Sequence, residues 1–172
     1  DPRLMAAGDA LIGNRIPEAE RLLRAHLHES PTDVAAIRML AEVAARLGRL
    51  DDAETVVVAL GSVLGTIKDT VDEMREQGVK IGVLGITCFR PWPTAAVREA
   101  LAGAKRVLVL EKSLAVGMGG IVGNNVSASF SGSPDRVHTV IAGLGGRSIT
   151  RSSLQRVFEQ ALADSLEPLT FL

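Results

Sequence analysis

The chain has 172 residues, a formal net charge of −1, four Phe, one Trp and no Tyr. A charge near zero gives no overall basic field that would attract nucleic acid or an anionic membrane, and so few aromatic rings leave little material for stacking on bases. The single cysteine, Cys88, excludes an internal disulfide and a thiolate metal cage, as is typical of a reducing cytoplasm. We therefore expect a cytoplasmic protein that binds neither nucleic acid nor a membrane.

The composition changes near residue 52. Residues 1–54 contain seven Arg, no Lys and three Gly, whereas all four Lys and the other fourteen Gly follow. This shift indicates two segments of different origin, although chance and the glycine demand of strand–helix turns would also produce it. The N-terminus lacks a charged-then-apolar signal pattern, and the longest uncharged run, 113–134, is so rich in Gly, Ser and Asn that it would span a membrane poorly.

Helices are predicted over about residues 3–13, 17–29 and 33–47. Leu22, Leu23 and Leu27 form an apolar stripe at helical spacing, and Pro17 suits a first helical turn. The sequence Ser-Pro-Thr-Asp at 30–33 ends the second helix and caps the third. The first third of the chain is therefore expected to fold as helical hairpins.

The same segment contains an internal repeat, in which similar residues recur 34 positions apart. Asn14 matches Gly48, and both residue types tolerate the left-handed conformation in which helices commonly end. The other matched pairs are Ala7 and Ala41, Ala10 and Ala44, Arg15 and Arg49, Ile16 and Leu50, Glu18 and Asp52, Ala19 and Ala53, and Glu20 and Glu54. That offset is the period of tetratricopeptide repeats, and small residues at matched positions let paired helices approach closely.

On this evidence residues 3–54 resemble one full tetratricopeptide repeat and the first helix of a second. Such repeats generally present a concave face that binds proteins, and about three copies are usually needed for stability. The second repeat is not expected to gain its second helix, because Glu54 runs into the β-branched residues 55–58. A helical cap that packs on the following domain or stays marginally stable is favoured, and a peptide-binding groove is the alternative.

From residue 54 onward, short apolar strands alternate with helices. Strands are predicted over 55–60, 79–86, 106–110 and 137–142, and helices over 64–77, 94–102, 121–130 and 151–165. Thr94 is expected to cap the second of these helices, and residues 148–150 the last. This alternation predicts an α/β fold with a mostly parallel sheet covered on both faces and right-handed crossovers.

Several motifs in this part of the chain resemble one family. Residues 53–62, Ala-Glu-Thr-Val-Val-Val-Ala-Leu-Gly-Ser, with Gly-Thr-Ile-Lys at 65–68, look like the start of core domain II of pyruvate:ferredoxin oxidoreductase and related 2-oxoacid:ferredoxin oxidoreductases. Residues 89–93, Phe-Arg-Pro-Trp-Pro, resemble the family's Arg-Pro-Phe-Pro corner, with Trp in place of Phe. Val-Leu-Glu-Lys at 109–112 and Ala-Gly-Leu-Gly-Gly-Arg at 142–147 also match its pattern.

The resemblance covers about residues 52–172 and implies a sheet similar to that of the C-terminal domain of transketolases. In this family thiamine diphosphate and Mg²⁺ are held by other domains, and iron–sulfur clusters need several cysteines. The family's reaction is oxidative decarboxylation of a 2-oxoacid, with CoA as acyl acceptor and ferredoxin or flavodoxin as electron acceptor. The resemblance thus implies no catalytic, cofactor-binding or metal-binding residue in this chain, and partners among the other domains or subunits of such an enzyme.

Two glycine-rich loops follow predicted strands. Residues 61–66, Gly-Ser-Val-Leu-Gly-Thr, open a helix but lack the Gly-Lys-Ser/Thr ending of a phosphate-binding loop, so a tight turn is favoured over a phosphate contact. Residues 117–123 miss the dinucleotide-binding spacing, because Val122 stands where the third glycine would be. Close backbone packing or a domain-interface loop is expected there rather than NAD binding.

The isolated reactive side chains favour structural roles. Cys88, beside Arg90, is predicted to be a buried structural thiol, and His138 to be a packed or edge histidine rather than a general base. His26 and His28 lie on different sides of a helix, which argues against a shared metal ion.

Two charged positions near strand ends leave alternatives open. Arg90 could bind a carboxylate or phosphate, or cap carbonyl groups at the end of the sheet. Glu111 and Lys112 stand at the carboxyl end of a predicted strand, where α/β proteins often bind ligands, but a local ion pair explains them as well.

The sequence therefore predicts a hybrid of two domains, residues 1–53 and 54–172. The first is a truncated tetratricopeptide-like hairpin, and the second is a non-catalytic structural domain of a 2-oxoacid:ferredoxin oxidoreductase that is inactive alone. Residues 52–54 satisfy both patterns, so natural recombination or deliberate construction could have joined them. An interaction module that uses the helical repeat, possibly with a peptide or protein ligand, and a small-molecule sensor that uses the glycine loops are the alternative functions.

Overall fold

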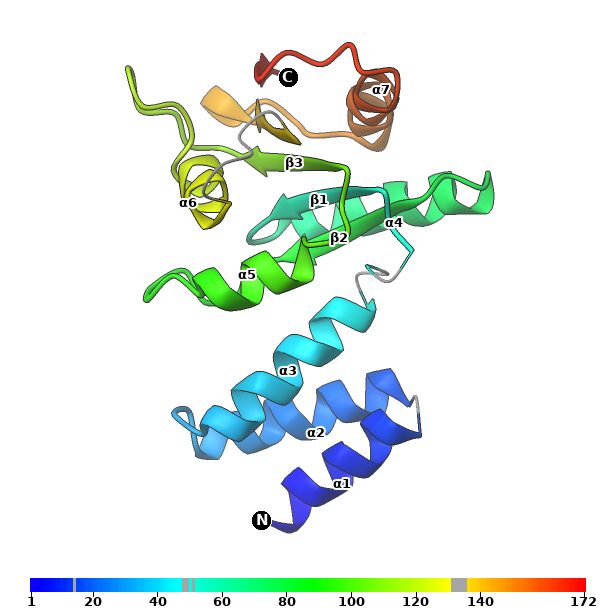
Figure 1. The fold of residues 1–172 in the computed structure, drawn as a ribbon, viewed down its shortest axis with the longest axis vertical. Helices are drawn as coiled ribbons and strands as arrows, with labels where there is room; N and C mark the ends of the chain where they lie inside the picture. Colours follow the sequence, from blue (N-terminus) through cyan, green and yellow to red (C-terminus); the bar gives the residue numbers. More distant parts are fainter. Residues whose placement is uncertain (14, 48–49, 51, 131–135) are drawn as a thin grey trace. The chain divides into compact units, whose positions relative to one another are not determined.

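The structure, a computed structural model, describes residues 1–13, 15–47, 50, 52–130 and 136–172 (Figure 1). The chain divides into two compact units, residues 1–48 and 49–172. The helix ends predicted at Asn14 and Gly48 lie outside the described residues. In the part of the chain that the structure describes, no helix is long and apolar enough to cross a bilayer.

The first unit consists of three helices, α1 (Pro2–Ile12), α2 (Ile16–Glu29) and α3 (Val34–Leu47), each packed on its neighbour in sequence. Among the side chains that the structure describes, alanines make up half of its core, which comprises Ala7, Ala10, Leu11, Ile16, Ala19, Leu23, Ala36 and Val43. The predicted cap of α3 is confirmed, because the Asp33 carboxylate accepts hydrogen bonds from the amides of Ala35 and Ala36 at 2.9 and 3.1 Å. The next element after α3 is a strand, so the second repeat lacks its second helix as predicted.

The second unit is built on a five-stranded parallel sheet in the order β2-β1-β3-β4-β5. The strands are β1 (Thr55–Ala59), β2 (Ile81–Gly85), β3 (Arg106–Glu111), β4 (Val137–Ile141) and β5 (Leu169–Phe171). Thr55 pairs with Ile81 on one side and Arg106 on the other, which sets the register at the centre of the sheet. Every residue of β1 is buried, as its unbroken run of Thr, Val and Ala predicts for a strand covered on both faces.

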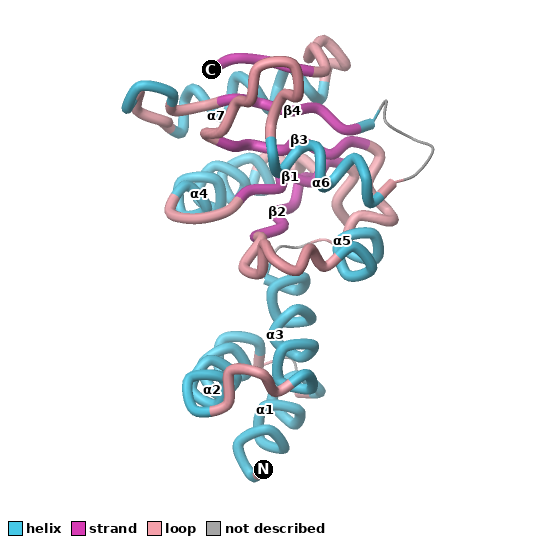
Figure 2. The backbone as a smooth tube through the Cα atoms, turned by 90° about the vertical axis from the view of Figure 1, so that its left-hand side faces the viewer, coloured by secondary structure: helices cyan, strands magenta, loops and turns pink. Residues whose placement is uncertain are grey.

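Helices cover both faces of this sheet (Figure 2). They are α4 (Val63–Glu76), α5 (Thr94–Ala100), α6 (Ile121–Ser129) and α7 (Arg151–Leu162). On one face α4 and α7 pack on Leu108, and on the other α5 and α6 pack on Val109. Neighbouring residues of β3 thus point into opposite cores, and the predicted α/β class is confirmed.

Two helix starts test the capping predictions. Thr150 caps α7, because its hydroxyl accepts the Ser153 amide at 3.2 Å while the Thr150 amide donates to the Ser153 hydroxyl at 3.1 Å. The prediction that Thr94 caps α5 is wrong, since Thr94 is the first helical residue and Pro93 holds the cap position. The ring of Pro93 restricts its φ to −83°, and the helix begins directly after it.

The edge strand β5 is absent from the sequence-based prediction. Its three residues, Leu-Thr-Phe, are too few to show an alternation, and none of them is fully buried. It becomes a strand only through pairing, when Leu169 lies beside Thr139 of β4.

Candidate functional site

The carboxyl ends of β1 and β3 form a topological switch point. The chain leaves β1 through α4 on one face of the sheet and leaves β3 through α6 on the other. The two connections therefore diverge, and a crevice opens between their starts. Doubly wound sheets characteristically bind ligands in this crevice.

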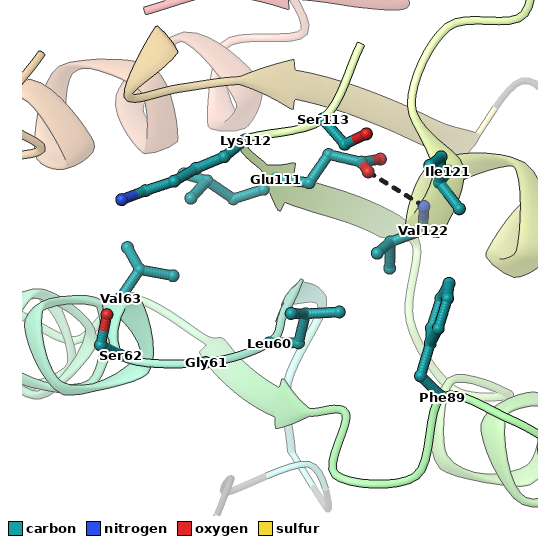
Figure 3. Close-up of a pocket in the computed structure, with 11 residues that line it drawn as sticks. Leu60, Gly61, Ser62, Val63, Phe89, Glu111, Lys112, Ser113, Ile121 and Val122 are labelled. Atoms are coloured by element: carbon teal, nitrogen blue, oxygen red, sulfur yellow. Dashed lines mark hydrogen bonds between the residues drawn. The ribbon is translucent and has the colours of Figure 1, made fainter. Parts of the chain in front are cut away.

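A cavity of about 640 Å³ lies at this point (Figure 3). Its wall consists of residues 60–63 after β1, residues 110–113 at the end of β3, Phe89, Ile121 and Val122. The volume falls in the range of small-molecule pockets, roughly 300–1,000 Å³. The structure thus brings the first glycine-rich loop and the Glu-Lys pair of the sequence to one site.

Apolar and polar groups lie on different sides of the cavity. Figure 3 shows Leu60, Phe89 and Val122 on one side, while Lys112 extends toward the side on which Ser62 and Val63 lie. The cavity therefore has an apolar side and a side with a cationic group.

Glu111 is buried beside the cavity, with 5% of the residue exposed. Its carboxylate accepts hydrogen bonds from the amides of Val122 at 3.0 Å and Gly123 at 2.9 Å. These amides stand at the positive end of α6, so they stabilise the carboxylate's negative charge. The alternative of a local ion pair with Lys112 is wrong, because the Glu111 carboxylate turns to α6 instead.

Two glycines let the start of α6 lie close to Glu111 and Thr139. A β-carbon on Gly120 would lie 1.9 Å from Oε1 of Glu111, and one on Gly123 would lie 2.4 Å from Oγ1 of Thr139. Both distances are far below van der Waals contact, so α6 can start this close to the sheet only with glycine at both positions. The close backbone packing predicted for residues 117–123 is confirmed at Gly120 and Gly123 but not at Gly117 and Gly119, where an added β-carbon would meet no atom within 4 Å. A role at a domain interface stays a prediction.

The loop between β3 and α6 also carries an ordered apolar tip. Ala115 and Gly119 exchange backbone hydrogen bonds of 2.8 and 2.9 Å, which close a tight turn. Val116 and Met118 in this turn are 98% and 70% exposed. Covering such side chains with a partner would remove their apolar surface from water, which favours binding.

The first glycine-rich loop is a tight strand–helix turn. Gly61 has a φ of +81°, a conformation that side chains other than glycine rarely adopt, and α4 begins two residues later at Val63. The favoured interpretation of residues 61–66 is confirmed, while the phosphate contact is untested.

The prediction of a buried thiol at Cys88 is wrong. Cys88 is exposed, and its thiol lies 3.6 Å from the carbonyl oxygen of Pro91. The strand before it ends at Gly85, so Cys88 already lies in the loop beyond the sheet. Arg90 in this loop donates to the carbonyl of its neighbour Phe89 at 2.8 Å, which is a loop carbonyl and not one at the end of the sheet.

The histidines have structural environments. His138 is half-buried in β4, between β3 and β5, and its Nδ1 lies 3.4 Å from the Glu167 carbonyl oxygen, so it is packed rather than at an edge. His26 is buried and His28 is exposed, which confirms that they lie on different sides of α2. In the described residues no group of three His, Cys, Asp or Glu side chains could hold a metal ion.

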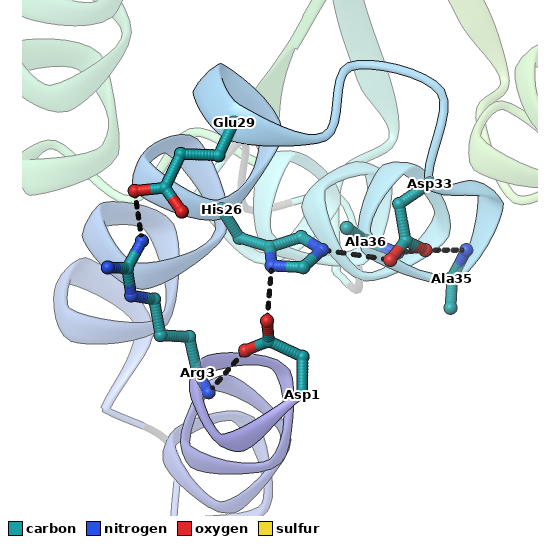
Figure 4. A network of polar contacts seen from close by, with 7 residues as sticks. All are labelled: Asp1, Arg3, His26, Glu29, Asp33, Ala35 and Ala36. Carbon is teal, nitrogen blue, oxygen red and sulfur yellow. Dashed lines mark hydrogen bonds and ion pairs between the residues drawn. The ribbon is translucent and has the colours of Figure 1, made fainter.

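His26 joins all three helices of the first unit (Figure 4). Its Nε2 lies 2.8 Å from an Asp33 oxygen at the start of α3, and its Nδ1 lies 3.7 Å from an Asp1 oxygen at the start of α1. The hydrogen bonds from His26 and from the amide of Ala36 lower the pKa of Asp33. The network is a polar support for helix packing.

Several charges at the amino edge of the sheet form ion pairs. The ion pairs are Arg75 with Asp52, Lys80 and Lys105 with Glu54, and Arg106 with Asp164. Hydrogen bonds from these cations lower the pKa of each of the three carboxyl groups. Each of these carboxylates is therefore held in its charged form.

Charges at the carboxyl edge are different. The loops that follow the first four strands carry Arg90, Lys112 and Arg147, and residues 60–63, 86–93, 112–120 and 142–150 contain no Asp or Glu. None of these three cations has a carboxylate partner within the described residues. This edge is therefore electropositive, although the chain as a whole is nearly neutral.

Sequence reasoning missed the wall of the cavity. Leu60 and Phe89 come from two separate loops and Ile121 from the start of α6, and no local pattern relates them. The sequence contains only a weak indication of the cap that Glu111 provides. A predicted buried strand ends in Glu, and glycines follow at positions 120 and 123.

The fold and the site define a doubly wound α/β domain with a crevice at its switch point, preceded by a helical repeat. Residues 53–154 match the family described as pyruvate:ferredoxin oxidoreductase core domain II, and residues 4–62 match a tetratricopeptide repeat family. The chain belongs to the pyruvate:ferredoxin oxidoreductase core domain II family. The two matches overlap at residues 53–62, where the structure forms β1 and not a helix.

Curated relatives are subunits of 2-oxoacid oxidoreductases. The chain is 41% identical over 114 residues to pyruvate synthase subunit PorA of Methanosarcina barkeri, covering 64% of this chain and 28% of that protein. It is 39% identical over 120 residues to PorA of Thermotoga maritima, covering 69% and 31%. It is 32% identical over 112 residues to ketoisovalerate oxidoreductase subunit VorA of Pyrococcus abyssi, covering 64% and 28%. The chain thus spans less than a third of these relatives.

A solved structure shares the fold. The 2-oxoglutarate:ferredoxin oxidoreductase from Magnetococcus marinus, with 2-oxoglutarate, coenzyme A and succinyl-CoA bound, aligns with a TM-score of 0.53 at 21% identity. The alignment covers 63% of this chain and 18% of that chain. At this identity the alignment shows a shared fold alone.

Proposed function

We propose that this chain provides core domain II of a 2-oxoacid:ferredoxin oxidoreductase and acts there as a structural domain without turnover of its own. The match of residues 53–154 to that domain carries the proposal. Because the chain covers only 28% of the Methanosarcina barkeri PorA, the remaining domains and subunits of such an enzyme are its expected partners. The exposed apolar turn at Val116 and Met118 is a candidate contact with them.

The donor groups of the chain do not fit the metal clusters of this family. An iron–sulfur cluster is held by several cysteine thiolates, and the chain has only Cys88. Glu111, the buried carboxylate at the crevice, already accepts two backbone amides. We propose that thiamine diphosphate, Mg²⁺, iron–sulfur clusters and CoA are bound by other parts of the enzyme.

An activity assay tests the absence of turnover. The purified chain is mixed with pyruvate, CoA, thiamine diphosphate, Mg²⁺ and ferredoxin, and ferredoxin reduction is followed against a blank without protein. We expect a rate equal to the blank, with intact pyruvate synthase of Thermotoga maritima as positive control. A rate above the blank that is lost on omitting thiamine diphosphate would overturn the proposal.

A domain replacement tests the structural role. Residues 53–172 of this chain replace the aligned segment of the Thermotoga maritima PorA, to which the chain is 39% identical. A domain that supplies structure and no reactive group should give an assembled enzyme that still reduces ferredoxin. An assembled enzyme without turnover, or a subunit that no longer assembles, would contradict the role.

A second candidate function is a protein-interaction module that uses the helical repeat. Large apolar side chains are exposed on the helices, with Ile12 at 86%, Met5 at 72% and Val34 at 67%. Such side chains are suited to a protein or peptide ligand. Pull-down of a partner that Val34→Glu abolishes, and that Val116→Glu on the α/β unit leaves intact, would favour this module over the structural role.

We further propose that the chain is a cytoplasmic hybrid with domains at residues 1–53 and 54–172. The lone cysteine and the overlap of the two family matches at residues 53–62 support this. Neither nucleic acid nor a membrane is an expected partner.

A further inference from the structure

We propose that the cavity at the carboxyl edge binds a small amphipathic anion, in which a carboxylate or phosphate group is carried on an apolar body. The proposal concerns the cavity of about 640 Å³ between the ends of β1 and β3. It is independent of the structural role proposed above, since it requires no other subunit.

The apolar body is matched by the wall of the cavity. Leu60 and Phe89 converge on it from two loops and Ile121 from the start of α6, and Leu60 and Ile121 keep 40% and 42% of their surface exposed to solvent. An apolar ligand that covers these side chains removes their surface from water, which favours binding. An alkyl chain or an aromatic ring suits such a wall.

The anionic group is matched by Lys112. The side chain of Lys112 lines the cavity, is exposed, and has no carboxylate partner among the described residues. Arg90 and Arg147 stand on the same edge, and the loops there hold no acidic residue. A concave site lined by one sign of charge concentrates ligands of the opposite sign.

The buried acid does not reverse this preference. Of the described residues that line the cavity, Glu111 alone is acidic, and two amides of α6 already bind its carboxylate. A cationic ligand would therefore meet Lys112 at the rim, and the carboxylate of Glu111 is buried with one amide already bound to each oxygen. A neutral ligand would gain no charge attraction from Lys112, so an anion is the best match.

The test uses the intact chain and sodium octanoate as the probe, with backbone amide signals followed by NMR. Octanoate is expected to shift the amides of residues 60–63 and 110–113. Two probes should bind more weakly than octanoate. Sodium acetate has the carboxylate without the alkyl chain, and 1-octanol has the alkyl chain without the charge. Octyl phosphate distinguishes the head group, because tighter binding than octanoate would assign a phosphate and weaker binding a carboxylate.

Variants of one lysine supply the controls. Lys112→Gln should weaken octanoate binding by about fivefold, the effect of losing roughly 1 kcal/mol of charge interaction, and leave 1-octanol binding unchanged. Lys112→Arg keeps the charge and should bind as the parent does. Lys105→Gln is the matched control, because Lys105 pairs with Glu54 at the opposite edge.

Three results would overturn the proposal. They are equal affinity for octanoate and 1-octanol, equal effects of Lys112→Gln and Lys105→Gln, and amide shifts confined to residues outside the cavity wall. The Lys112→Arg variant separates loss of charge from a folding defect, because a misfolded site would fail in both Lys112 variants.

Discussion

At the scale of single residues, Glu111 shows how a buried charge is stabilised by backbone rather than by a cation. Its carboxylate occupies the position that a side-chain cap holds in other helices, but it comes from the preceding strand and binds the amides of Val122 and Gly123. Glycine at position 120 keeps the space for it. The stabilisation of this charge therefore requires the acid at position 111, the free amides at the start of α6 and the glycine at position 120 at the same time.

Replacing the carboxylate by an amide should destabilise the α/β unit. Glu111→Gln removes the negative charge and can accept only one of the two amide hydrogen bonds well, so we expect a loss of about 2 kcal/mol in the free energy of unfolding. Urea denaturation measures it. Glu73→Gln, at an exposed ion pair with Arg151 on the surface, is the control and should change stability by less than about 1 kcal/mol.

Adding one methyl group at a glycine should have opposite effects at two positions. Gly120→Ala forces a β-carbon against Glu111 and should cost about 3 kcal/mol. Gly65→Ala lies within α4 with no atom near its β-carbon, so it should stabilise by about 0.5–1 kcal/mol. Thermal unfolding of both variants compares them, and equal effects would contradict the packing described here.

At the scale of elements, each helix start solves the same problem with different groups. The amides at the start of α7 are satisfied by neighbouring Thr150 and Ser153, those of α3 by Asp33, and those of α6 by a residue of another element. Local caps are readable from sequence because cap and amides are two or three residues apart. The cap of α6 is not, since its donor and acceptor are eleven residues or more apart.

The start of α3 should respond to pH. Hydrogen bonds from His26 and from nearby amides make the pKa of Asp33 lower in the folded chain than its ordinary value. Its contribution to stability is therefore present above the ordinary carboxyl pKa and is lost as the pH falls through the lowered value. Amide hydrogen exchange in α2 and α3 should be faster in Asp33→Asn than in the parent at neutral pH.

The same comparison in acid checks the sign. Below the lowered pKa of Asp33 the parent and Asp33→Asn should exchange at the same rate, because the carboxyl is then neutral in both states of the parent. Asp9→Asn, at an exposed position of α1, should match the parent throughout. A difference between parent and Asp33→Asn that grows in acid would contradict the linkage.

At the scale of the whole molecule, the chain contains separate hydrophobic cores. The core of the helical unit includes Leu23, and the two cores that sandwich the sheet include Leu154 and Val109. Among the residues whose side chains the structure describes, each unit thus buries apolar surface of its own, as a compact domain does.

Core truncations should act on the unit that contains them. Leu23→Ala and Leu154→Ala each remove a fully buried side chain and should cost about 2–5 kcal/mol. Native-state hydrogen exchange should show faster opening of α1–α3 with Leu23→Ala, and of the sheet with Leu154→Ala. Parallel loss of protection in both units from either substitution would show that they unfold as one.

Most of the fold could be read from local patterns. The strands β1 and β3 are unbroken apolar runs, and the helices show apolar stripes. Thr150 and Asp33 mark helix starts. The α/β class and the helices that precede it therefore follow from the sequence. Cys88 was misplaced because the strand before it ends earlier than its apolar run. The strand β5 is missed because pairing, rather than its own three residues, makes it a strand.

The sequence by itself determined the resemblance of each half to its family, the order of the elements up to α7, and the single cysteine, because each of these is a matter of composition or of residues close along the chain. Only the tertiary structure decided the cavity, the electropositive edge and the role of Glu111. Leu60, Phe89, Lys112 and Val122 are distant in sequence, and they become neighbours only because parallel strands end at the same edge of the sheet.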